Sequence, residues 1–134
     1  MNADRDPTDF LPLKPAAFHI LLSLADSSRH GYGIMQEVQE RTKGSVKLGP
    51  GTLYGAIKRL LADELIAEEE EKHARRSYPV GNRTLDDERR RYYSLTPLGR
   101  RVITLDAERL AHLVEMAQEK QLLNRSSLTV SIKN

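Results

Sequence analysis

The sequence predicts a mainly α-helical protein that contains a small β-hairpin and ends in a long C-terminal helix. Three observations lead to this fold class. Apolar residues recur at helical spacing in three segments between residues 14 and 64. The spacing then changes over residues 65–95, where two short strand-like segments flank a loop rich in turn residues. A further helical segment with its own start signal follows from residue 97.

The chain is expected to begin with a flexible N-terminal arm over residues 1–13, which are polar and carry two prolines. Pro15 suits the first turn of a helix, so the first helix is predicted from there to about residue 25. Its apolar side chains follow the i, i+3, i+4, i+7 pattern of a core-facing stripe: Phe18, Leu21, Leu22 and Ala25.

A glycine-bearing turn joins the second and third predicted helices, over residues 32–43 and 52–64. The second places Ile34, Met35 and Val38 inward, and Gly44 ends it. The third has one apolar face, made of Leu53, Ile57, Leu60 and Leu61. Its opposite face carries Thr52, Tyr54, Gly55, Lys58 and Arg59.

Two strands are predicted at residues 65–71 and 89–95, around a loop over residues 72–88. Four consecutive glutamates make the first strand weak by propensity alone. Pairing the two strands as a hairpin places these glutamates opposite Arg89, Arg90 and Arg91, and opposite charges across a ladder stabilise it modestly. In the second strand Tyr93 and Leu95 are expected to face inward.

The last helix is predicted over residues 97–123, because Thr96 is a capping residue and Pro97 suits the first helical position. Two apolar stripes run along it, so it is expected to cover both its own domain and a partner chain. The predicted dimer seam alternates in steps of four and three: Ile103, Ala107, Leu110, Val114 and Ala117. Residues 124–134 are expected to form a flexible tail.

The order of these elements, three helices followed by a hairpin, is that of a winged helix-turn-helix domain, here over residues 14–96. In such units the third helix presents its N-terminal residues to base edges in the DNA major groove. Gly49-Pro50-Gly51-Thr52 gives this helix a small, backbone-exposing start that attracts phosphate.

The net charge of +2 says little about partners, but the basic residues cluster. Residues 72–101 carry nine basic and three acidic side chains, a local excess of six. This cluster indicates a polyanionic partner, and a solvated arginine-rich loop is the equally weighted alternative.

The sequence argues against enzymatic, metal and membrane functions. It has no cysteine, no apolar run long enough to span a membrane and no secretory signal, so a cytoplasmic location is expected. Its four histidines (His19, His30, His73 and His112) have no metal-ligand spacing, and no nucleotide-type glycine loop or nucleophile elbow occurs. We therefore expect no catalytic residues, no metal and no cofactor.

Three blocks give the chain a specific resemblance: His30-Gly31-Tyr32-Gly33-Ile34, Pro50-Gly51-Thr52-Leu53-Tyr54 and Tyr92-Tyr93-Ser94-Leu95-Thr96-Pro97-Leu98-Gly99. In combination they resemble the signature of the PadR family of bacterial transcriptional regulators, in its short form with a single C-terminal helix. Two departures are Gly49, where the family often has serine, and a wing loop that is longer than usual.

The resemblance implies a homodimer that binds an inverted repeat in double-stranded promoter DNA, usually as a repressor. The DNA-contacting residues predicted at the starts of the third and second helices are Gly51, Thr52, Tyr54, Lys58 and Tyr32. In the wing loop Arg75, Arg76 and Arg83 are predicted, because they have no nearby acid in the predicted hairpin. Some alternatives stay open. Tyr54 can instead pack on the wing, the start of the second helix can be purely structural, and Arg59 can pair with Asp63 rather than meet phosphate.

Two further functional hypotheses accompany this one. A small-molecule effector, of unidentified chemistry, would act by changing the angle between the two subunits. The competing function is that of a winged-helix interaction module that binds protein or RNA instead of operator DNA.

Overall fold

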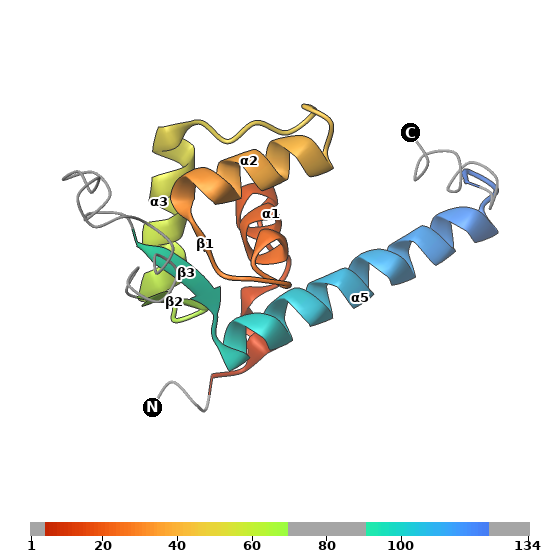
Figure 1. Cartoon of the computed structure of the whole chain (residues 1–134). Coiled ribbons are helices and arrows are strands. Elements are labelled where there is room, and N and C mark those ends of the chain that lie inside the picture. The colour runs from red at the N-terminus through yellow and green to blue at the C-terminus, as the bar shows by residue number, and fades with distance from the viewer. Residues whose placement is uncertain (1–4, 70–90, 124–134) are drawn as a thin grey trace, which may run out of the picture.

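The computed structural model describes residues 5–69 and 91–123, and it has the predicted order of elements (Figure 1). Three helices precede the hairpin, and a long helix follows it. Along the chain the elements are η2 (Pro7–Phe10), α1 (Pro15–Ser23), β1 (Arg29–His30), α2 (Gly31–Arg41), α3 (Pro50–Ala62), β2 (Ile66–Glu69), β3 (Tyr92–Leu95) and α5 (Pro97–Glu119). The mainly helical winged helix-turn-helix fold is thereby confirmed.

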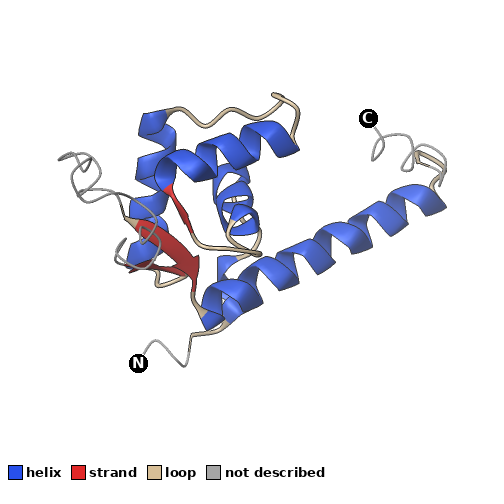
Figure 2. Cartoon of the chain, in the orientation of Figure 1, coloured by secondary structure: helices blue, strands red, loops and turns tan. Residues whose placement is uncertain are grey.

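The small sheet has the strand order β1-β3-β2 and is antiparallel throughout (Figure 2). The predicted hairpin is correct: Ile66 pairs with Leu95, and Glu69 pairs with Tyr92. One predicted charge pair lies in the described residues, between Glu68 and Arg91 at 3.8 Å, and its exposure keeps its contribution small. Residues 70, 71, 89 and 90, the rest of that prediction, lie outside the described residues.

Strand β1 was not predicted. It has two residues, too few for any periodicity to be visible, and it pairs with the edge of β3 that β2 leaves open. This third strand leads directly into α2, so the start of α2 is tied to the hairpin.

The core lies where α1, α2, α3 and the first turns of α5 meet. Six of its apolar side chains have no exposed surface: Ile20, Leu21, Ile34, Val38, Leu53 and Val102. The predicted stripe of α1 is correct at Leu21 but incomplete, since Phe18 and Leu22 are only half-buried whereas Ile20 and Leu24, which were not predicted, are buried. The reason is that α1 contacts α2, α3 and α5, and a central helix buries more than one stripe.

The N-terminal segment packs on the domain, so the prediction of a flexible arm is wrong for residues 5–13. Helix η2 lies against α5, and Phe10, Leu11 and Leu13 pack against the core. The backbone amide of Leu13 donates to Oδ2 of the buried Asp106 on α5, at 3.3 Å. Apolar contacts and this hydrogen bond outweigh the polar composition that suggested flexibility. Residues 1–4 lie outside the described part.

Helix α5 starts at a hydrogen-bonded joint with the end of α3. The hydroxyl of Thr96 accepts from the Gly99 amide at 2.9 Å and donates to the Glu64 carbonyl at 2.7 Å. Gly99 abuts the Leu65 carbonyl so closely that a Cβ would collide with it. The cap at Thr96 is therefore as predicted, whereas the helix ends at Glu119, four residues before the predicted end. Its distal half extends away from the domain (Figure 1).

Candidate nucleic-acid interface

Helix α3 buries one face and leaves the other free, as a recognition helix requires. Leu53, Ile57 and Leu60 are buried in the core. The opposite surface exposes the residues predicted from the sequence: Gly51, Thr52, Tyr54 and Lys58. The N-cap residue Gly49 has no side chain to accept hydrogen bonds, and Pro50 occupies the first turn. The first free amides of α3 therefore have no side-chain cap.

Tyr54 is both exposed and structural. Its side chain keeps 49% of its surface exposed, yet its ring lies against Gly31 at the start of α2, where a Cβ would collide with the ring. The alternative that Tyr54 packs as structure is thus correct in part, but the partner is the first turn of α2. Two of the three sequence blocks meet at this contact.

The start of α2 is held by a side-chain cap. Nδ1 of His30 accepts a hydrogen bond from the Gly33 amide at 3.1 Å, which makes His30 the N-cap of the helix. Tyr32 stacks beside the His30 ring, with centroids 6.4 Å apart, and keeps 52% of its surface exposed. The His30–Tyr32 segment therefore combines a structural residue with an exposed one.

Arg59 does not pair with Asp63, contrary to one of its two predicted roles. Asp63 is engaged instead by Arg5, whose guanidinium lies 3.5 Å from the carboxylate and donates to the Asp63 backbone carbonyl at 2.8 Å. Arg59 has no ion pair within residues 5–69 and 91–123. Among the described residues, Arg59 and its neighbour Lys58 are thus both cations of α3 without an ion pair.

The inner face of the hairpin packs against the core through Tyr93. This side chain is buried, and burial raises the pKa of its hydroxyl, with the negative charge of Glu68 adding to the effect. The raised pKa is the consequence of packing this hydroxyl group on the core. The predicted wing contacts Arg75, Arg76 and Arg83 lie outside the described residues.

Lys47 is a candidate that the sequence interpretation missed. It lies exposed in the connection between α2 and α3 and lines the same surface hollow as Tyr32. The signal was present in the sequence, since a lysine three residues before Pro50 precedes the recognition helix directly.

The distal part of α5 exposes an apolar face. Leu110 is 37% exposed, and Leu113 and Met116 are exposed beside it. The predicted seam needs one correction, because Ile103 is buried in the core of its own domain with 5% exposure. At Ile103, helix α5 is still packed on its own domain, and it extends away from the domain about one turn later. The other predicted seam residues, Ala107, Leu110, Val114 and Ala117, are exposed or half-buried.

Neither a metal cluster nor a membrane-spanning helix is found in the described part of the chain. No three histidine or acidic side chains gather as a metal would require, and no helix has the length and apolarity to cross a bilayer.

The sequence and the fold of this chain are similar to those of known proteins. Residues 20–105 match the family described as the Transcriptional regulator PadR-like family. The Transcriptional regulator Rv3488 of Mycobacterium tuberculosis is 35% identical over 95 residues, which make up 71% of this chain and 75% of that protein. An uncharacterized 37.1 kDa protein in transposon TN4556 of Streptomyces fradiae is 37% identical over 94 residues. This match covers 70% of the chain but only 22% of the Streptomyces protein.

A solved structure shares the fold. The PadR family transcription regulator from hypervirulent Clostridium difficile R20291 superposes with a TM-score of 0.61 and 24% identity. The match covers 81% of this chain and 99% of that one.

Proposed function

Because this chain belongs to the PadR-like family of transcriptional regulators, we propose that it is a repressor that binds an inverted-repeat operator as a homodimer. Members of this family regulate transcription and are not enzymes. The observation that carries the proposal is the exposed face of α3, which offers an uncapped N-terminus, the Lys58 cation and a half-exposed tyrosine.

In this proposal the start of α3 enters the major groove. Gly51 lets the backbone approach a phosphate, Thr52 contacts a phosphate or a base edge, and Tyr54 contacts a phosphate or an apolar group in the groove. Lys58, one turn further on, neutralises a phosphate. The support is that all four are exposed on the side of α3 that faces away from Leu53.

Phosphate contacts on either side of α3 would fix its orientation. Tyr32, exposed at the start of α2, and Lys47, exposed in the connection before α3, border one hollow formed by α2 and that connection. We assign both to the phosphate backbone. Arg75, Arg76 and Arg83 are assigned to phosphate or the minor groove, an assignment that rests on their charge and their place in the wing loop alone.

The second subunit would pack on the distal face of α5. Leu110, Val114 and Ala117 form its centre, and Leu113 and Met116 extend it. These apolar side chains are otherwise left in water, and the alanines permit close approach of two helices. Pairing there sets the distance between two copies of α3, so half-sites about 10 base pairs apart are expected. A regulator of this kind would meet its operator in the cytoplasm.

The test is a titration of duplex DNA from upstream of the gene, followed by fluorescence anisotropy at several salt concentrations. The wild type should prefer this duplex over a scrambled one and lose affinity steeply with salt. Lys58→Gln should reduce the slope of log K against log salt by about 0.9, the value for one phosphate contact. Lys120→Gln, which removes an exposed charge at the far end of α5, is the matched control and should leave the slope unchanged.

The same titration separates the alternative function. Retention of unrelated RNA with no preference for the duplex, or a slope that Lys58→Gln leaves intact, would contradict the operator-binding proposal and favour an interaction module.

A further inference from the structure

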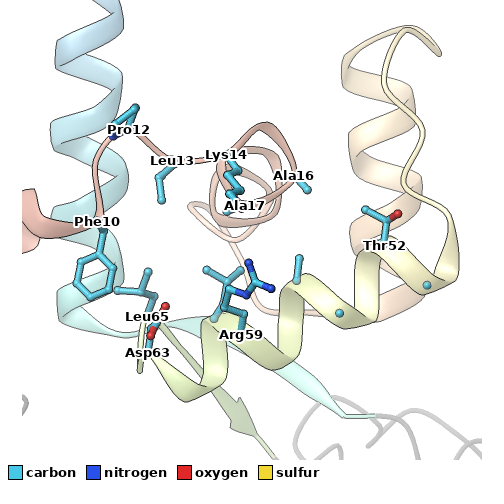
Figure 3. A pocket seen from close by; sticks show the side chains of 14 residues that line it. Phe10, Pro12, Leu13, Lys14, Ala16, Ala17, Thr52, Arg59, Asp63 and Leu65 are labelled. Atoms are coloured by element: carbon cyan, nitrogen blue, oxygen red, sulfur yellow. The ribbon is translucent and has the colours of Figure 1, made fainter.

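A cavity of about 450 Å³ lies beside the recognition helix, between α3, the start of α1 and the N-terminal segment. Its apolar wall is formed by Phe10, Leu13, Ala17, Leu60 and Leu65. Figure 3 shows the Arg59 side chain reaching from α3 toward Lys14 and Ala17, with Phe10 and Leu65 at one end and Thr52 at the other. This volume lies within the range, about 300–1,000 Å³, of sites that hold small organic ligands.

The charges around the cavity favour an anion. Lys14 and Arg59 both line it, and neither has an ion pair among the residues that the structure describes. The single carboxylate in the lining, Asp63, is already neutralised by Arg5. Within the described part of the chain, two cations without an ion pair therefore line an apolar hollow whose one lining carboxylate is already engaged.

The shape of the lining favours an aliphatic body over a flat one. Phe10 is the one aromatic ring in the cavity lining, and the Arg5 guanidinium lies over it at 4.8 Å from its centroid. That cation–π contact occupies one face of the ring, and the lining holds no second aromatic ring on which a planar ligand could stack. Alanine, glycine and leucine supply most of the remaining wall.

We propose that this cavity binds a small aliphatic carboxylate, with Arg59 and Lys14 on the carboxylate and the hydrocarbon chain against Leu13, Ala17 and Leu65. A guanidinium that meets a carboxylate at the edge of an apolar wall forms a charge-assisted hydrogen bond in reduced dielectric. The hydrocarbon contributes in proportion to the apolar area that it buries.

Such a ligand would compete with DNA, a consequence that rests on the proposed operator binding. Gly51, Thr52 and Gly55 line the cavity and also belong to the exposed face of α3. An occupant beside them would narrow the space for a phosphate backbone and withdraw Arg59 from it. The carboxylate would thus act as an inducer at the recognition helix itself, without a change in the dimer.

The test uses the full-length protein labelled with ¹⁵N, and sodium octanoate as the probe. Octanoate should produce saturable shifts at the amides of Ala17, Gly55 and Ala56, whereas 1-octanol and octylammonium should bind far more weakly. Arg59→Gln should weaken octanoate binding by about tenfold, the loss expected for one charge-assisted hydrogen bond. Lys58→Gln is the matched control, since it removes the neighbouring cation of the same helix, which does not line the cavity.

A second variant fills the site without endangering the fold. A Cβ on Gly55 meets nothing within 4 Å, and leucine has the higher helix propensity, so Gly55→Leu should fold and block octanoate. Absence of shifts at these amides, equal binding of 1-octanol, or unchanged binding in both Arg59→Gln and Gly55→Leu would overturn the proposal. A protein that binds octanoate at this site but never binds duplex DNA would refute operator binding and leave the cavity assignment standing.

Discussion

The hydroxyl end of the Tyr54 ring lies against Gly31 so closely that no Cβ fits on residue 31 while the ring keeps its place. Gly31 belongs to the first turn of α2, and Tyr54 to α3. The contact therefore sets the spacing of the two helices that form the helix-turn-helix. Since half of Tyr54 remains exposed, one side chain both positions α3 and forms part of its outer surface.

Gly31→Ala should displace the Tyr54 ring and destabilise the protein by about 1 kcal/mol, at the low end of the cost of overpacking, because the atoms it meets are the half-exposed end of a side chain. Tyr54→Ala removes the obstacle, so the double variant should be more stable than the sum of the two single effects predicts. Urea unfolding of the four proteins measures this coupling. Additive effects would show that the ring and Gly31 do not compete for the same space.

Gly99→Ala should be more damaging than an ordinary glycine substitution in a helix. Its Cβ would meet the Leu65 carbonyl, which is backbone and cannot rotate away, so a loss of about 3 kcal/mol or more is expected. Gly55→Ala is the control, because its Cβ enters open space and should stabilise α3 by about 1 kcal/mol. Thermal unfolding monitored by circular dichroism compares the two, and equal transition temperatures would contradict the joint at Gly99.

Gly31 and Gly99 illustrate which features a sequence can predict and which it cannot. Periodicity and cap chemistry were sufficient for the helices and for the cap at Thr96, because both signals are local. The partners of Gly31 and Gly99 are 23 and 34 residues away, at Tyr54 and Leu65 respectively. No local sequence pattern predicts such long-range contacts, and only the folded structure shows them.

The predictions that were wrong failed for the same reason, because they too depended on contacts between residues far apart in the sequence. Ile103 matches the heptad seam of α5, yet α5 is packed on its own domain at that residue, and periodicity does not distinguish a core from a subunit interface. The N-terminal segment looked loose by composition, but Asp106 and Asp63 hold it from distant parts of the chain. Arg59 has no ion pair in residues 5–69 and 91–123, and its expected partner Asp63 is held by Arg5, 58 residues away.

Leu110→Glu should convert the proposed dimer into a monomer. A charge on the exposed apolar face of α5 would be buried without a partner at the interface, which costs several kcal/mol, and operator affinity should fall with the loss of the second half-site. Sedimentation velocity measures the mass, and circular dichroism should show an unchanged fold, since residue 110 is already exposed in the single chain.

The matched control for this change is Leu122→Glu. Leu122 is 75% exposed just beyond the end of α5, so the same chemical change there should leave the sedimentation coefficient as in the wild type. Ile103→Glu, in contrast, should unfold the domain, because it places a charge in the core. A Leu110→Glu protein that still sediments as a dimer would exclude this face of α5 as the interface.

His19 should make the protein less stable at mildly acidic pH. Its ring Nδ1 lies 3.3 Å from the Arg41 guanidinium, which also pairs with Glu37 at 2.9 Å. Burial lowers the pKa of His19 in the folded protein, the Arg41 charge lowers it further, and Glu37 opposes both. The unfolded chain then binds the proton more tightly, so this contribution to stability is fully present above about pH 6.5 and is lost as the pH falls toward the lowered folded pKa.

Urea unfolding between about pH 7.5 and 5.5 should show the decline in the wild type and a smaller one in His19→Gln, with His112→Gln on the exposed part of α5 as the control. A decline of equal size in His19→Gln would assign it to other groups.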